Sequence, residues 1–203
     1  MLRDLDPDRS VDKATYKTRK EELSLRLGAL QREARERGVP VIILFEGAVA
    51  AGKGSLINEL ILPLDPRGCT VYSTLEPNEE EALRPPLWRF WVRTPRAGRI
   101  AVFDRSWYQD VLDESANDAG EALELERRFR DIRAFEQQLI DGGAVIVKFF
   151  LHVSKSEQKK RMKKLEDNKA TAWRVTKRDW QEHKHYEQFL ESADRMMAKT
   201  ASD

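Results

Sequence analysis

A glycine-rich segment at residues 47–54 has the composition of a phosphate site. It reads GAVAAGKG, and Gly47, Gly52 and Lys53 have the G-x-x-x-x-G-K spacing of a phosphate-binding loop. In such a loop, backbone N–H groups converge on an anion and the lysine adds a positive charge. Gly54 stands where the motif usually has a Ser or Thr that binds Mg²⁺. A simple turn between a strand and a helix is the alternative, but the flanking sequence favours a phosphate site.

The carboxylate of Asp104 is the second candidate group. It ends the apolar run in RIAVFDRSWY, and Arg105 follows it directly. Nucleotide-binding α/β sheets place a metal-binding carboxylate at the end of a strand beside the phosphate loop. An Asp after a strand can also be a helix cap or a turn residue. Together with the upstream loop, Asp104 is predicted to bind Mg²⁺.

Basic and aromatic side chains gather further along the chain. Arginines crowd around RPPLWRFWVRTPRAGR, and lysines and arginines are frequent in the carboxyl-terminal third. Such a run is often only a solvated helix face, but a channel or lid for a polyanion is the competing interpretation here. Trp88, Trp91 and Trp107 could stack on a base or lie in the core. The three histidines have no spacing that indicates catalysis or shared metal binding, so we assign them no role.

Four short apolar runs predict the strands that position these groups, at residues 41–46, 69–74, 99–104 and 144–153. The first, VIILFE, has the pattern of a strand buried on both faces, and the others are of the same kind. Helical patterns cover residues 12–37, 53–62 and about 121–140. Ser154 to Glu157 and Thr176 to Asp179 have the pattern of capping boxes, at the start of a basic helix and of the final helix. This alternation predicts a three-layer α/β fold, with a parallel sheet flanked by helices.

Composition bounds the remaining possibilities. The chain has 203 residues with 36 Lys+Arg and 35 Asp+Glu, a balance that indicates neither nucleic-acid nor membrane binding. Cys69 is the only cysteine, which excludes an intramolecular disulfide and suits a reducing compartment. No run approaches the roughly 18 apolar residues of a spanning helix. We expect a single domain in a soluble, cytoplasmic protein.

Several segments together resemble the polyphosphate kinase 2 family. They are FEGAVAAGKGSLIN, RPPLWRFWVRTPRAGRIAVFDRSWY, KFFLHVSKSEQKKR and AWRVTKRDW, in the family's order. The resemblance implies a P-loop kinase-like domain over residues 1–203, with an amino-terminal helix (12–38), a core (41–153) and a basic helical lid (154–200). It also implies an Mg²⁺-dependent homo-oligomeric enzyme that moves phosphoryl groups between polyphosphate and a nucleotide (AMP/ADP or GMP/GDP). The segment from Asp65 through WRFW looks most like the polyphosphate:AMP phosphotransferase branch.

The matching positions imply the residues of the site. Catalytic roles fall to Lys53, Asp104, Arg105 and Arg161, with Asp104 as the metal ligand. Phosphate or nucleotide binding falls to Gly47, Ala51, Gly52, Lys53, Gly54, Ser55, Arg89 and Arg174. Gly54 is expected, because the family's loop has glycine after its lysine.

Two positions depart from the family. In the family, an Asp of the loop binds the metal together with the Asp at the strand end, but this chain has Val49 at that loop position. Many members also have a basic residue where this chain has Asp110. One alternative is therefore a degenerate, weakly active or inactive member that binds nucleotide or polyphosphate as a regulatory or scaffold subunit. An ATP-dependent nucleotide kinase is a second alternative, although it predicts a Ser or Thr after Lys53. An active kinase is favoured, with Asp104 as the only protein carboxylate on the metal.

Overall fold

A four-stranded parallel sheet forms the centre of the protein. The structure is a computed structural model, and it describes residues 2–6, 9–112 and 119–201. The strands β1 (Val41–Gly47), β2 (Cys69–Ser73), β3 (Ile100–Asp104) and β4 (Val145–Leu151) follow the order β2-β3-β1-β4. In the register, Phe45 of β1 pairs with Asp104 of β3 and with Phe149 of β4. The predicted strands and the parallel α/β class are confirmed.

The two central strands differ from the two edge strands in burial. Nearly every residue of β1 and β3 is buried, as the apolar runs predicted. The strands β2 and β4 are largely exposed, and Val147 and Phe149 of β4 are 36% and 42% exposed. The prediction that all four runs are buried on both faces is therefore wrong for β2 and β4, because each lies at an edge of the sheet.

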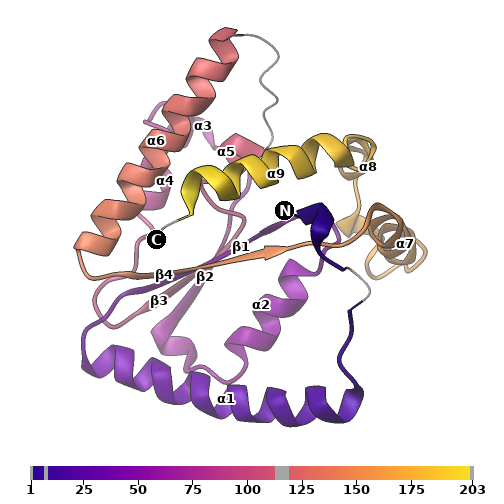
Figure 1. Cartoon of the computed structure of the whole chain (residues 1–203). Coiled ribbons are helices and arrows are strands. Elements are labelled where there is room, and N and C mark those ends of the chain that lie inside the picture. The colour runs from indigo at the N-terminus through magenta and orange to yellow at the C-terminus, as the bar shows by residue number, and fades with distance from the viewer. Residues whose placement is uncertain (1, 7–8, 113–118, 202–203) are drawn as a thin grey trace.

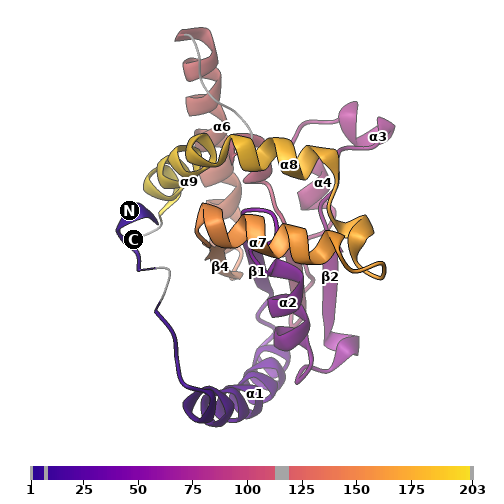
Figure 2. The same cartoon turned by 90° about the vertical axis from the view of Figure 1, so that its right-hand side faces the viewer.

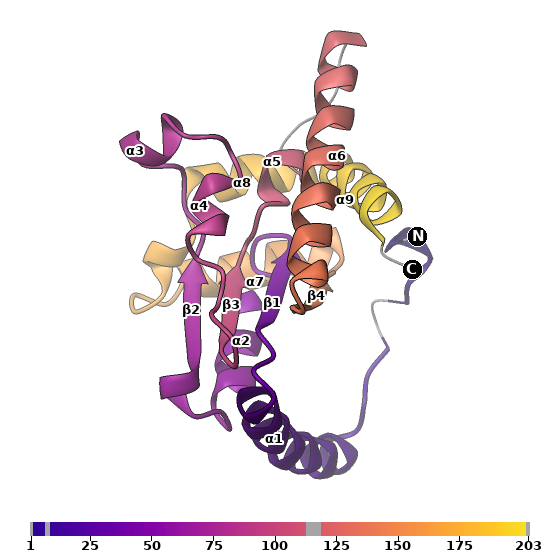
Figure 3. The same cartoon turned by 90° about the vertical axis from the view of Figure 1, so that its left-hand side faces the viewer.

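Helices cover both faces of the sheet (Figure 1). On one face lie α1 (Lys13–Glu36) and α2 (Lys53–Ile61), and on the other lie α6 (Ala119–Asp141) and α9 (Tyr186–Thr200), as Figure 3 shows from the other side. The shorter elements are η1 (Leu2–Asp4) before α1, and η2 (Pro66–Gly68), α3 (Glu79–Ala82), α4 (Trp88–Trp91) and α5 (Gln109–Leu112) between the longer ones. Within the described residues, no helix is long and apolar enough to cross a membrane.

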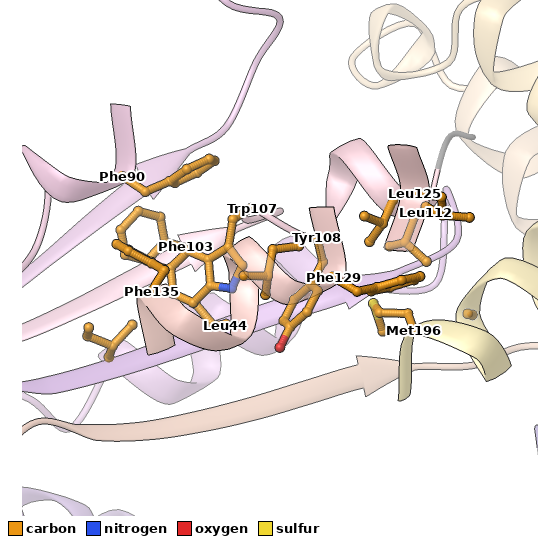
Figure 4. Close-up of a cluster of buried hydrophobic side chains, with 14 of the residues drawn as sticks. Leu44, Phe90, Phe103, Trp107, Tyr108, Leu112, Leu125, Phe129, Phe135 and Met196 are labelled. Carbon is orange, nitrogen blue, oxygen red and sulfur yellow. The ribbon is translucent and has the colours of Figure 1, made fainter. Parts of the chain in front are cut away.

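The larger core lies between the sheet and the layer of α6 and α9 (Figure 4). Trp107, only 1% exposed, packs edge-on against Phe90, Phe103 and Phe135. Its indole therefore belongs to the core and is not available to stack on a base. The smaller core, on the other face, joins Ile43, Phe45 and Val102 to residues of α2 and α1.

A buried carboxylate fixes the chain that follows β3. Glu136 of α6 accepts hydrogen bonds from Trp107 Nε1 at 3.0 Å and from the Tyr108 hydroxyl at 2.5 Å, and it pairs with Lys148 of β4 at 2.6 Å. Its charge is thus compensated, as a buried carboxylate requires. This network ties the segment after Asp104 to both α6 and β4.

Two further helices cross the end of the sheet toward which the strands point (Figure 2). They are α7 (Lys155–Glu166) and α8 (Lys177–Lys184), joined through η3 (Ala172–Arg174). The predicted capping box at Thr176 and Asp179 is complete. At Ser154 only half of the predicted box forms, because the Glu157 carboxylate bonds Arg161 at 2.8 Å instead of turning back to the cap. The predicted final helix is two helices, α8 and α9, which divide at His185.

Candidate active site

The phosphate loop, residues 47–54, leaves the carboxyl end of β1 and leads into α2. Gly47 has a φ of 130°, and a Cβ there would lie 2.2 Å from the carbonyl oxygen of Leu151 on β4. Only glycine allows this close approach of two backbones. Gly52, with a φ of 107°, directly precedes α2, whose amino-terminal end therefore adjoins the loop. This is the strand–loop–helix arrangement that suits an anion.

Lys53 folds back onto the loop. Its Nζ donates to the carbonyl oxygens of Gly47 at 2.6 Å and Ala48 at 3.1 Å. Burial, followed by repulsion from Arg105, lowers the pKa of the lysine, while the carboxylates of Asp104 and Glu46 act in the opposite direction. The ammonium group is thus already inside the loop and close to the end of β3.

The turn after β3 is held by both neighbouring strands. Arg105 has a φ of 63°, and its N–H donates to Phe45 O of β1 at 3.0 Å. On the other side, Thr74 donates through its N–H to Asp104 O at 3.0 Å and through its hydroxyl to Arg105 O at 2.7 Å. A non-glycine residue in the left-handed region is uncommon and is kept there by surrounding contacts. The turn therefore fixes Asp104 and Arg105 next to the loop.

Glu46 is a site residue that sequence reasoning missed. It precedes Gly47, is 4% exposed, and accepts hydrogen bonds from the N–H and the hydroxyl of Ser106 at 2.6 and 2.7 Å. Burial raises the pKa of Glu46 to about 7, against the opposing effects of Ser106 and Lys53. The signal in the sequence is a carboxylate inside the otherwise apolar run VIILFE. Glu46 joins the phosphate loop to the turn after β3.

Helix α7 brings Arg161 to the loop, as the resemblance implied. Arg161 Nη1 donates to Ala51 O at 3.0 Å, while its Nε donates to Glu157 on the same helix. One turn earlier, Gln158 donates to Val49 O at 3.1 Å. Gln158 in turn contacts His183 of α8. Sequence reasoning assigned no role to either of these two residues.

The other predicted binding residues lie at varying distances from this centre. Ala51 is buried, whereas Gly54 and Ser55 are exposed on the first turn of α2. Arg89 is buried, donates to Leu75 O at 2.7 Å and pairs with Glu81 at 3.5 Å. Its Nε has no hydrogen-bond partner in the described part of the chain.

The rim of the site carries further charges. The pKa of the Glu76 carboxyl, just after β2, is lowered mainly by its hydrogen bond to Arg178 and also by the charges of Arg105 and Arg89. These three arginines therefore surround one carboxylate. Arg174 is exposed and stacks on Trp173 at 5.3 Å, with no hydrogen bond to the loop among the described residues. Asp110, on α5, is exposed as well.

The carboxylate of Asp104 fits a magnesium ion. Across residues 2–6, 9–112 and 119–201, no hydrogen bond or ion pair engages its oxygens, and no group of three metal-binding side chains forms. Mg²⁺ is commonly bound by one or two carboxylates together with substrate phosphates and water. Asp104 offers one carboxylate beside the loop that could serve as such a ligand, and the side chain of Val49 offers none.

Comparisons with known proteins all point to one family. The sequence pattern of the polyphosphate kinase 2 family matches residues 10–203. A polyphosphate:AMP phosphotransferase from Pseudomonas aeruginosa is 36% identical over 96% of this chain and 39% of its own length. An AMP/ADP-polyphosphate phosphotransferase from Meiothermus ruber is 32% identical over 89% of this chain and 68% of its own length.

The folds agree as well. The crystal structure of polyphosphate kinase 2 from Arthrobacter aurescens superimposes with a TM-score of 0.92 and 30% identity, covering all of this chain and 75% of that one. The chain spans about two fifths of the length of the Pseudomonas and Acinetobacter relatives that it matches.

Proposed function

The chain belongs to the polyphosphate kinase 2 family, and we propose that it transfers a phosphoryl group between inorganic polyphosphate and a nucleoside mono- or diphosphate. The observation that carries this proposal is the convergence of Lys53, Arg161 and the Asp104–Arg105 turn on one phosphate loop. Phosphoryl transfer needs mainly positioning and charge stabilisation from the protein, and this arrangement provides both.

Each residue has a distinct task in the proposed reaction. Lys53 exchanges the carbonyl oxygens of Gly47 and Ala48 for phosphoryl oxygens, which are stronger acceptors because they are charged. Arg161 and Arg105 neutralise negative charge on the transferred group. Asp104 would hold magnesium, which would supply charge neutralisation for the phosphoryl groups.

Polyphosphate fits the donor site better than ATP does. Gly54 leaves α2 without the hydroxyl that ATP-dependent P-loop enzymes use for magnesium. The helix α7, which crosses the strand ends (Figure 2), is rich in cations, as suits a long polyanion: Lys155, Lys159, Lys160, Arg161, Lys163 and Lys164. The names of the relatives include AMP, ADP and GDP acceptors, and AMP is the first acceptor to test here.

We also propose that the protein is a homo-oligomer. The apolar stripe of α1 is only partly covered, since Leu27 packs against the smaller core while Tyr16, Leu23 and Leu30 are about half exposed. An exposed apolar stripe of this kind marks an interaction surface. Light scattering of the purified protein measures its mass in solution, and a monomer would contradict the proposal.

One experiment tests the activity and its metal ligand together. The purified protein is incubated with Mg²⁺, polyphosphate and AMP, ADP, GMP or GDP in turn, and new nucleotide is measured. We expect product with at least one acceptor, and we expect Asp104→Asn to lower the rate by roughly a hundredfold or more, a typical cost of removing one preorganised electrostatic group. Val49→Asp adds a carboxylate to the loop and should lower the Mg²⁺ concentration at half-maximal rate.

Three outcomes would contradict the proposal. Absence of product with every acceptor, together with activity in Val49→Asp, would indicate a degenerate member of the family. Product formed only when ATP replaces polyphosphate would identify a nucleotide kinase. An unchanged rate in Asp104→Asn would remove this carboxylate from the metal site.

A further inference from the structure

Helix α7 contacts the phosphate loop through two side chains on one face. Gln158, 2% exposed, donates from Nε2 to Val49 O at 3.1 Å, and Arg161 donates to Ala51 O at 3.0 Å. Residues three apart on a helix lie side by side, so both bonds come from a single turn. Figure 2 shows this helix crossing the strand ends next to α8.

These two bonds also fix the direction of loop N–H groups. In a trans peptide the C=O and the following N–H point in opposite directions. Holding Val49 O and Ala51 O toward α7 therefore turns the N–H groups of Ala50 and Gly52 away from it. In the described part of the chain neither N–H donates to a protein acceptor. Both residues have positive φ, 57° and 107°, as in the backbone concavities that bind anions.

A buried histidine sets the orientation of the glutamine. A carbonyl oxygen only accepts hydrogen bonds, so the amide nitrogen of Gln158 must face Val49, and its oxygen faces His183 Nδ1 at 2.6 Å. His183 Nδ1 consequently carries the proton and donates. The His183 ring is 9% exposed and packs edge-on against Trp180. The imidazole thus prevents the amide from rotating.

Gln158 differs from Arg161 in one respect that matters for the reaction. The cationic Arg161 is expected to turn toward phosphate when substrate binds, and it then leaves Ala51 O. The neutral, buried Gln158 has no such alternative partner, because its two polar atoms are already used by Val49 and His183. It is the contact from α7 that remains while the loop holds phosphate.

We propose that Gln158 and His183 are positioning residues, which hold the phosphate loop at Val49 so that its N–H groups face the bound phosphate. The inference rests on the proposed function for its consequence in catalysis, but the effect on loop order stands apart from any activity. The proposal also gives Val49 a role: its backbone carbonyl oxygen is the acceptor by which Gln158 holds the loop, although its side chain cannot bind metal.

Amide hydrogen exchange measured by mass spectrometry tests the proposal directly. The variants are Gln158→Met, which removes both bonds, and His183→Phe, which replaces the imidazole by an aromatic ring without a donor and leaves Gln158 in place. His185→Phe is the matched control, since this exposed histidine lies at the junction of α8 and α9 and its side chain bonds only Gln188 of α9 among the described residues. Should Gln158→Met fail to fold, His183→Phe carries the same test.

We expect amides of residues 47–54 to exchange at least about fivefold faster in Gln158→Met, while those of β3 keep their wild-type rates. The value of kcat/KM for polyphosphate should fall about tenfold, the size of one lost hydrogen bond of about 1.4 kcal/mol. His183→Phe should act in the same direction. The double variant should be no worse than Gln158→Met, because His183 acts through Gln158.

The proposal is overturned by unchanged exchange in the loop, or by equally faster exchange in β3, which would indicate general destabilisation. Additive effects of the two substitutions would also overturn it. If wild type and variants alike transfer no phosphoryl group, the proposed function fails, and the exchange rates alone decide the present inference.

Discussion

Replacing Glu46 by glutamine should change how stability depends on pH. Glu46 lies fully inside the protein between the phosphate loop and the turn after β3, and its carboxylate accepts two hydrogen bonds from Ser106. Burial raises its pKa from 4.5 to about 7, because the low-dielectric interior disfavours the charged form. Glutamine keeps the size and an acceptor oxygen for Ser106, but it cannot ionise.

The sign follows from which state releases its proton first. Below about pH 4.5 the Glu46 carboxyl is protonated in both the folded and the unfolded state, and its contribution to the free energy of unfolding is at its maximum. As the pH rises, the unfolded chain ionises first and the folded protein holds its proton until about pH 7, so the wild type loses stability over this window. At about 1.4 kcal/mol per tenfold change in affinity for the proton, the loss reaches about 3 kcal/mol.

Urea unfolding of both proteins at intervals from pH 4 to pH 8 measures this effect. Taking the difference between E46Q and wild type cancels the titrating groups that do not interact with Glu46. We expect this difference to move in favour of E46Q by about 3 kcal/mol, mostly between pH 4.5 and 7. Ser106→Ala, which removes one bond that lowers the pKa of Glu46, should extend the upper end of the window to higher pH. Parallel curves for E46Q and wild type would refute the reasoning.

Two further substitutions test the supports of the loop and of the core. Gly47→Ala should abolish or nearly abolish transferase activity and lower the Tm in a thermal scan, because the new Cβ would lie 2.2 Å from Leu151 O. A variant with wild-type activity and Tm would contradict this close approach of the two backbones. Glu136→Gln should lower the free energy of unfolding, measured by urea denaturation, by about 2 kcal/mol, because Lys148 loses its charged partner. The control Glu126→Gln, at an exposed ion pair, should lower it far less. Equal effects of the two substitutions would show that the buried pair contributes no more than the exposed one.

The sequence was most informative where local pattern and burial coincide. The apolar runs of β1 and β3 are continuous because both strands lie in the middle of the sheet, covered on both faces. The runs of β2 and β4 also contain β-branched and aromatic residues, with Thr, Ser or Lys among them, yet these strands lie at the edges of the sheet. The order of the strands depends on contacts between segments and cannot be predicted from any one of them. The half-formed cap at Ser154 has a similar cause, since Glu157 finds a stronger partner in Arg161.

The candidate site divides in the same way. Lys53 and Asp104 could be predicted, because the loop spacing and the strand end are local signals. Glu46 and Gln158 could not, because each acts on a partner distant in the sequence: Ser106 in the first case and Val49 in the second. For His183, spacing tests only nucleophilic catalysis and shared metal binding, and neither test detects a residue that orients another side chain.

Val49 shows why phosphate binding and metal binding should be considered separately in this chain. The shape of the loop depends on glycines at its ends and on backbone carbonyl oxygens held by Lys53, Gln158 and Arg161. None of these contacts involves the side chain at position 49, so valine leaves the cradle for phosphate intact. What valine lacks is the second carboxylate that the family resemblance implies for the metal. A substitution that restores it should therefore alter the requirement for Mg²⁺ strongly and the affinity for polyphosphate much less.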